Sequence, residues 1–290
     1  MILLLHRTGK YPALALGSKL ALGVLVIVSV IAFAAAPPRP SDLLRIFIPA
    51  IPPGSILLAA SILGLMPTGI NVAIWHSLWA VEHLKEWEKT AKDKPDMLRL
   101  GMTDLRIGYW LSAILAVVFV SLGANLLKPR GLAPDGIEVA LTLSRIYTDL
   151  LGEWMFPVFM LAAFAAMFST SYSVMDGFPR TFASLLRTLF PHSDFLKKPL
   201  NPAYWIFMAV IFVFAVAVNT LLPNPVLMVT LVGIISLLVA PVLYSLNYYC
   251  ATRLIEDESM RPTGLMRLWA LSGILIMTFA VGFSLYIRLR

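Results

Sequence analysis

Apolar residues fill the chain in long runs that short charged stretches separate. Four runs lack Asp, Glu, Lys and Arg and have the length of one membrane-spanning helix, about 20 residues. They are Leu20–Pro38, Ile107–Leu127, Trp154–Met175 and Leu268–Ile287. A fifth run, Pro199–Thr252, is long enough for two spans, and Pro223 and Pro225 separate them because proline ends helices.

The sixth run, Ile46–Val81, is too long for one span and too short for two spans with a turn. We therefore predict one interrupted helix here, and a single transmembrane domain over residues 1–290. Its expected spans are 13–36, 55–82 (broken at 66–70), 107–127, 152–175, 203–222, 226–249 and 266–288. Between the third and fourth spans, the pattern over 136–150 predicts a short amphipathic helix, with Ile137, Leu141 and Ile146 near one face.

Composition supports an all-α integral membrane protein. Of the 290 residues 59% are hydrophobic and 13% are charged, and the mean hydropathy is +0.83. Soluble domains carry about a quarter charged residues. The single cysteine, Cys250, excludes an internal disulfide and a cysteine-based metal cage. The histidines are scattered, and we find no nucleophile or phosphate-loop motif, so we do not expect an enzyme.

Loop charges predict the orientation of the chain. On alternate sides of the seven spans, one side carries fifteen Lys and Arg residues and the other carries seven. The positive-inside rule then places the N-terminus in the cytoplasm and the C-terminus outside. The net charge of +7 is thus explained by cytoplasmic loops, and nucleic-acid binding is not expected.

The interruption of the second span carries the chemistry. Pro67 cannot donate a backbone hydrogen bond, and Gly69 tolerates most backbone geometries, so the helix can open between two halves. Opened backbone inside a membrane must line a cavity or be buried in protein. Its carbonyls, with the oxygens of Thr68 and Asn71, can bind a cation, as at the midplane of many transporters. The alternative is a proline-kinked helix without a ligand.

His76 lies within the second span, five residues after Asn71. An ionisable side chain inside a span suggests a functional role, and histidine changes its charge near neutral pH. His76 is therefore a candidate for a proton path or gate. The alternative is a structural histidine that hydrogen-bonds a neighbouring helix.

The fourth span ends in a polar motif, Ser169-Thr170-Ser-Tyr-Ser-Val-Met-Asp176-Gly-Phe-Pro-Arg180. Asp176 and Arg180 are four residues apart and can form an ion pair on one helix face. Capping at the cytoplasmic boundary would explain the same residues.

This motif, together with Met66-Pro-Thr-Gly-Ile-Asn-Val-Ala-Ile-Trp-His-Ser-Leu-Trp79, resembles the Nramp family of divalent metal transporters, and in particular its bacterial Nramp-related branch. The resemblance implies a LeuT-type inverted-repeat fold, present here in part. By the match, the first span resembles family helix five, the second helix six and the last helix eleven. The Asp-Pro-Gly-Asn segment of family helix one does not occur in the sequence, so half of the family's metal site is not expected in this chain.

Two alignments of the interrupted helix give different metal ligands. The commoner family pattern has a methionine seven residues before a His-Ser pair. Counting back from His76 reaches Gly69, which leaves Thr68, Gly69 and Asn71 as the metal residues and no thioether. Alignment on Met66-Pro67 makes Met66 the alternative ligand but needs a three-residue insertion. A site of hard oxygens suits magnesium and manganese, whereas a thioether favours softer ions.

The resemblance thus implies a secondary transporter of divalent cations, of the manganese and iron or the magnesium class, in the inner membrane. Its partners would be the metal ion, the lipid bilayer and a chain that supplies the missing helices, with protons as a second coupled ion and no bound cofactor. Two alternatives remain open. One is a non-transporting fragment or subunit that needs this partner chain, and the other is a LeuT-type amino-acid permease.

Overall fold

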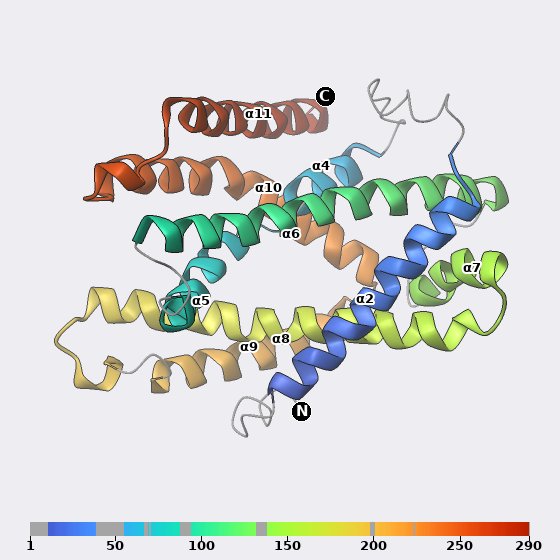
Figure 1. The fold of residues 1–290 in the computed structure, drawn as a ribbon, viewed down its shortest axis with the longest axis horizontal. Coiled ribbons are helices and arrows are strands. Elements are labelled where there is room, and N and C mark those ends of the chain that lie inside the picture. Colours follow the sequence, from blue (N-terminus) through green and yellow to red (C-terminus); the bar gives the residue numbers. More distant parts are fainter. Residues whose placement is uncertain are drawn as a thin grey trace. The chain divides into compact units, whose positions relative to one another are not determined.

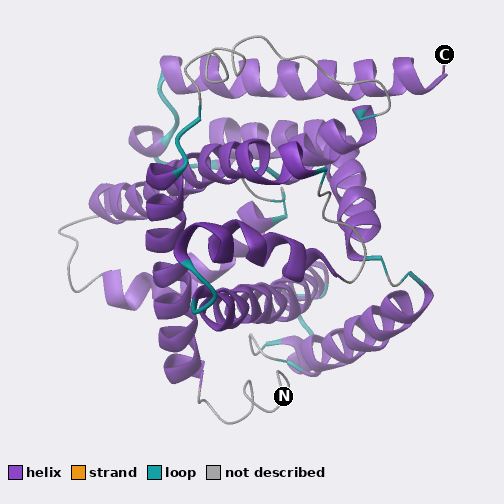
Figure 2. Cartoon of the chain, turned by 90° about the vertical axis from the view of Figure 1, so that its right-hand side faces the viewer, coloured by secondary structure: helices purple, strands orange, loops and turns teal. Residues whose placement is uncertain are grey.

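The computed structural model describes residues 11–38, 55–66, 69, 71–87, 94–131, 138–197, 201–222 and 224–289. Regular structure in these residues is helical (Figure 2). The α-helices, labelled in Figure 1, are α2 (Tyr11–Ala35), α4 (Ile56–Leu65), α5 (Val72–Trp87), α6 (Lys94–Leu122), α7 (Val139–Leu151), α8 (Met155–Leu189), α9 (Pro202–Leu221), α10 (Pro225–Tyr249) and α11 (Gly264–Leu289).

Five stretches of the described helices are long and apolar enough to cross a membrane: Pro95–Leu127, Met155–Leu189, Pro202–Leu221, Pro225–Leu254 and Gly264–Tyr286. Leu20–Ala35, Ile56–Leu65 and Val72–Val81 are shorter apolar helices. The part of the chain that the structure describes is thus all-helical, with several helices that could cross a membrane.

Helix α6 begins well before the span expected at 107–127. It starts at Lys94, with Pro95 and Asp96 in its first turn, and both residues favour a helix N-terminus. From Leu122 it continues as a π-helix over Gly123–Leu127. The charged stretch before 107, which we read as loop, is thus partly helical. Charges limit the membrane-embedded part of a helix but do not end its backbone hydrogen bonds.

The chain divides into two compact units, of which the first comprises Met1–Pro49 and Ser112–Pro225. Helices α2, α7, α8 and the end of α6 enclose its main core. The buried members are Ala32, Val118, Leu122, Leu127, Ile146, Tyr147, Met155 and Phe159. A smaller core of Met175, Ala183, Tyr204 and Met208 joins α8 to α9.

Helix α7 is the amphipathic helix expected over 136–150. Ile146 and Tyr147 are buried, whereas Glu138, Arg145 and Asp149 are exposed, as the pattern predicts. Leu141 was expected on the buried face but is exposed, and Ile137 lies outside the described residues. The Tyr147 hydroxyl lies 2.9 Å from the Ser29 hydroxyl of α2, and its ring stacks on Phe159 of α8. These contacts tie α7 to both neighbours.

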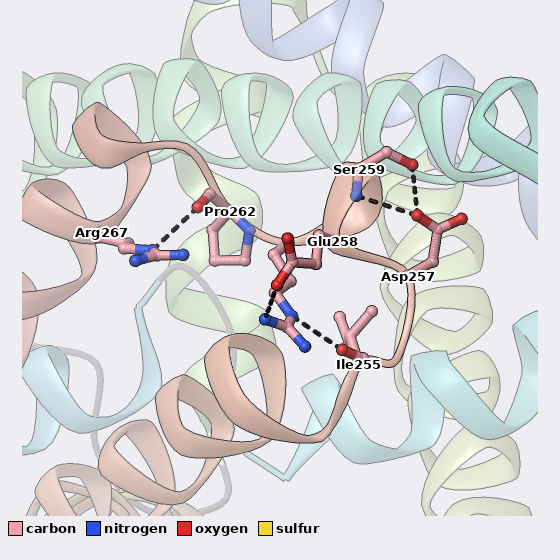
Figure 3. Close-up of polar contacts among 7 residues, drawn as sticks. Ile255, Asp257, Glu258, Ser259, Pro262 and Arg267 are labelled. Atoms are coloured by element: carbon pink, nitrogen blue, oxygen red, sulfur yellow. Dashed lines mark hydrogen bonds and ion pairs between the residues drawn. The ribbon is translucent and has the colours of Figure 1, made fainter.

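The second unit comprises Ala50–Leu111 and Val226–Arg290. It holds α4, α5, the first part of α6, α10 and α11. The connection from α10 to α11 is braced by arginines (Figure 3). Arg261 donates to the Ile255 carbonyl at 2.8 Å and to Glu258 at 3.0 Å, and Arg267 donates to the Pro262 carbonyl at 3.0 Å. Two of the basic residues behind the predicted orientation thus also hold this loop in shape.

Candidate functional site

The interruption between α4 and α5 lies where the sequence analysis expects it. Helix α4 ends at Leu65, and the Met66 N–H still donates to the Ile62 carbonyl at 2.9 Å. Met66 itself is extended, with φ −99° and ψ 136°, which is the conformation that a residue before proline prefers. Helix α5 begins at Val72. Pro67, Thr68 and Ile70 lie outside the described residues.

Gly69 and Asn71, two of the three predicted metal residues, lie together in this interruption. A Cβ built on Gly69 would be 2.8 Å from Asn71 Oδ1, so the side-chain amide oxygen lies over the glycine. The third predicted residue, Thr68, is outside the described residues, and so is Pro67, which was predicted to break the helix. The Met66 side chain, the alternative ligand, is 43% exposed at the end of α4.

The carbonyls of this segment already accept bonds from the start of α5. The Gly69 oxygen accepts from the Val72 N–H at 3.0 Å, and the Asn71 oxygen accepts from the N–H groups of Ile74 and Trp75 at 3.1 and 3.2 Å. A carbonyl oxygen has two lone pairs, so an accepted bond leaves room for a cation at Gly69. The Asn71 carbonyl accepts two bonds, so its side-chain oxygen is the better ligand.

His76 lies one turn inside α5 and has a partner that the sequence analysis missed. Its Nε2 is 3.5 Å from Oδ2 of Asp104 on α6, and the two side chains are 29% and 73% exposed. Asp104 falls in the charged stretch that we read as loop, so no helix face linked it to His76. The two groups attract strongly only when the imidazole is protonated.

The polar motif of the fourth span forms part of one continuous helix, α8. Asp176 and Arg180 pair as expected, with Arg180 Nε and Nη2 each 2.9 Å from a different carboxylate oxygen of Asp176. Tyr204 of α9 also donates to Asp176, at 2.7 Å. The Thr170 hydroxyl bonds the Ala166 carbonyl, and the Ser169 carbonyl accepts from Ser173. The Thr170 and Ser173 hydroxyls therefore donate hydrogen bonds to carbonyls of their own helix.

Within the described residues, no group of three His, Cys, Asp or Glu side chains could hold a metal ion. At the interruption, the described oxygens that lie together are the Asn71 side-chain oxygen and the backbone carbonyls of Gly69 and Asn71. Such a set suits a hard cation that is bound by carbonyl and amide oxygens.

Comparison with known proteins identifies the family. The family model described as natural resistance-associated macrophage protein-like, or Nramp, matches residues 1–287. The chain belongs to the Nramp family. Membership implies the LeuT-type fold and divalent metal transport, and Nramp transporters are not enzymes. The predicted resemblance to the Nramp family is confirmed.

A relative from Pasteurella multocida (strain Pm70), an uncharacterized protein, is 29% identical over 170 residues. The match covers 56% of this chain and 37% of the relative. The chain thus spans little more than a third of that protein's length. Divalent metal transport is an activity of a whole Nramp transporter. For this chain, a role in that transport is therefore a proposal.

Proposed function

We propose that this Nramp chain contributes part of the path for divalent cations through a secondary transporter of the cytoplasmic membrane. The cation would lie at the interruption between α4 and α5, with Gly69, Asn71 and Thr68 as its ligands. The observation that supports this proposal is the placement of the Asn71 amide oxygen over Gly69, where α4 and α5 separate.

The ligand set favours magnesium or manganese over softer ions. Amide and carbonyl oxygens are hard ligands, and no thioether stands at position 69 when the chain is aligned on His76. Met66 remains the alternative ligand, and it would shift the preference toward manganese, iron and cadmium. Family membership favours a metal cation over an amino acid as the substrate.

His76 would serve as a proton path or gate, with Asp104 as its ionic partner. This proposal rests on the 3.5 Å between His76 Nε2 and Oδ2 of Asp104 on α6, and on the ability of an imidazole to accept and donate a proton. The proposed orientation, with the N-terminus in the cytoplasm, rests on the loop charges.

Residues outside these 290, in the same polypeptide or in another, would complete the site. A hard divalent cation takes six or more oxygen ligands, and the described interruption offers only a few. The helices that resemble the family's first four would supply the rest. Alone, the chain would bind the ion weakly and would not transport it.

Binding of Mn²⁺ to the full 290-residue chain tests the site. Free Mn²⁺ can be counted by its electron paramagnetic resonance signal as the protein is added. Asn71→Ala should weaken binding about tenfold, because a contact to a charged group is worth roughly 1.5 kcal/mol or more. Asn247→Ala on α10 is the matched control and should bind as the wild type does. Equal binding by the wild type and Asn71→Ala would contradict the proposed site.

A further inference from the structure

Helices α4 and α10 belong to the second unit (Figure 1). They meet backbone to backbone at two glycines, Gly64 and Gly233. A Cβ built on Gly64 would lie 2.0 Å from the Gly233 carbonyl oxygen and 2.8 Å from the Leu237 nitrogen. A Cβ built on Gly233 would lie 2.6 Å from the Ser61 carbonyl oxygen and 2.7 Å from its Cα. Each helix therefore occupies the space that a side chain on the other would need.

The buried small residue Ser61 takes part in this crossing, and both helices carry further buried small residues. Ser61 is 3% exposed, and its hydroxyl donates a long bond of 3.4 Å to the Val229 carbonyl. Ala60 and Ala240 are buried as well. In lipid, helices associate mainly through close van der Waals packing, and small residues allow the closest approach. The crossing thus has the features of a tight, specific contact.

The crossing lies directly beside the interruption. Gly64 is the second-last residue of α4, and the chain leaves the helix at Met66. On α10, the helix-weakening Pro241 comes eight residues after Gly233, about two turns away from the crossing. Gly233 therefore lies away from Pro241, whereas Leu237, the other α10 residue near Gly64, is the residue whose carbonyl loses its helical hydrogen bond to Pro241.

We infer that Gly64 and Gly233 are positioning residues for the interruption. Their contact fixes the end of α4 on α10 and so sets where Gly69 and Asn71 stand. A ligand constellation must be held within about half an ångström of its productive geometry, so a shift of α4 would weaken the site. This consequence for metal binding rests on the proposed function, whereas the position of α4 does not.

A distance measurement tests the position of α4 without any metal. Spin labels on Met66→Cys and on the native Cys250, at the end of α10, report the separation by pulsed paramagnetic resonance. Gly233→Ala should shift or broaden the distance distribution, because the new methyl group meets backbone atoms that cannot rotate away. Gly273→Ala on α11, where a Cβ has open space, is the matched control. An unchanged distribution in Gly233→Ala would overturn the inference.

Mn²⁺ binding to the unlabelled variants then separates this inference from the proposed function. Gly233→Ala should bind about tenfold more weakly, and Gly273→Ala should bind as the wild type does. If the distance shifts and the wild type binds no Mn²⁺, the proposed function is wrong and the positioning role stands. If the distance shifts and Mn²⁺ affinity is unchanged, the crossing does not set the ligand positions and the inference fails.

A third measurement covers the case in which Gly233→Ala does not fold. In a Cys250→Ser background, Ser61→Cys and Ile62→Cys are alkylated by a maleimide in detergent. Ser61 faces the crossing, whereas its neighbour Ile62 is 52% exposed. The thiol at 61 should react many times more slowly than the thiol at 62. Equal rates would show that α4 does not rest on α10 and would overturn the inference.

Discussion

The Tyr204 hydroxyl of α9 lies 2.7 Å from Oδ1 of Asp176 on α8, and this carboxylate is also the partner of Arg180. Asp176 is 6% exposed and Tyr204 is fully buried, so the two helices share a polar contact inside an otherwise apolar interface. Phe182 and Phe207 stack at 4.2 Å across the same pair of helices. A buried carboxylate needs such partners because its charge has lost its water.

Removal of these partners should have unequal effects on stability. Tyr204→Phe loses one bond to a charged group, which costs about 1.5 to 3 kcal/mol. Arg180→Ala leaves the carboxylate without its ion pair and should cost about 3 to 5 kcal/mol. Tyr249→Phe, at an exposed tyrosine, is the control and should be neutral. Thermal unfolding in detergent, followed by circular dichroism, measures the order.

A double-mutant cycle checks that the cost comes from this network. In the Asp176→Asn background the carboxylate is neutral, so Tyr204→Phe and Arg180→Ala should each cost less than in the wild type. Strictly additive effects would mean that Tyr204 and Arg180 act on stability independently of Asp176.

The attachment of α7 should respond to alkaline pH. Burial raises the pKa of the Tyr147 phenol above its usual 10.0, and the Ser29 hydrogen bond offsets only part of this rise. A raised pKa in the folded state means that this contribution to stability is fully present below pH 10 and is lost as the pH rises further. Tyr147→Phe cannot ionise and should lose less stability between neutral pH and pH 11. Parallel pH curves for the two proteins, measured as unfolding temperatures, would contradict this.

Ser29→Ala separates the hydrogen bond from the burial. The variant removes the 2.9 Å contact but leaves the Tyr147 ring stacked on Phe159. It should cost about 1 kcal/mol at neutral pH. Stability should still fall as steeply at alkaline pH, because burial is the larger cause of the raised pKa of Tyr147. Chemical or thermal unfolding at two pH values gives both quantities.

The sequence predicted the features that local residues determine. Proline and glycine act on their own backbone, so the residues at 67 and 69 predicted an interruption in this stretch, and α4 and α5 are separate helices there. The period of apolar residues located α7, although Leu141 is exposed because the helix buries a narrower face around Ile146 and Tyr147.

The sequence did not predict contacts between distant helices. Nothing near Asp176 indicates Tyr204, and nothing near His76 indicates Asp104, because both pairs depend on how helices pack. The crossing at Gly64 and Gly233 could not be predicted from the sequence for the same reason. Glycine is frequent in membrane helices, and only the packing of the helices shows which two glycines meet. The membrane boundaries of the spans remain predictions.

The isolated chain should not transport metal. After reconstitution in liposomes, uptake of Mn²⁺ or Mg²⁺ should not exceed that of empty vesicles, because the described interruption supplies only part of a divalent coordination shell. Vesicles with an added ionophore, which carries the ions across the bilayer, are the positive control and show that uptake can be detected. Saturable uptake by the 290-residue chain would show that it needs no partner.

Substitutions at the interruption should separate ligand charge from ligand softness. Asn71→Asp places a full negative charge beside the cation and should strengthen the binding of Mg²⁺, Mn²⁺ and Cd²⁺ together. Gly69→Met adds a thioether and should favour Cd²⁺ and Mn²⁺ over Mg²⁺, because only the softer ions gain from sulfur. Position 69 is crowded, however, since a new Cβ lies 2.8 Å from Asn71 Oδ1 and must displace that side chain.

Gly69→Ala is therefore the matched control, because it causes the same displacement without adding sulfur. Competitive titration of the Gly69→Met and Gly69→Ala variants then measures the effect of the thioether on ion selectivity. If these two variants select alike and Met66→Ala abolishes the preference for Mn²⁺ over Mg²⁺, then Met66 is the ligand and the alignment on His76 is wrong.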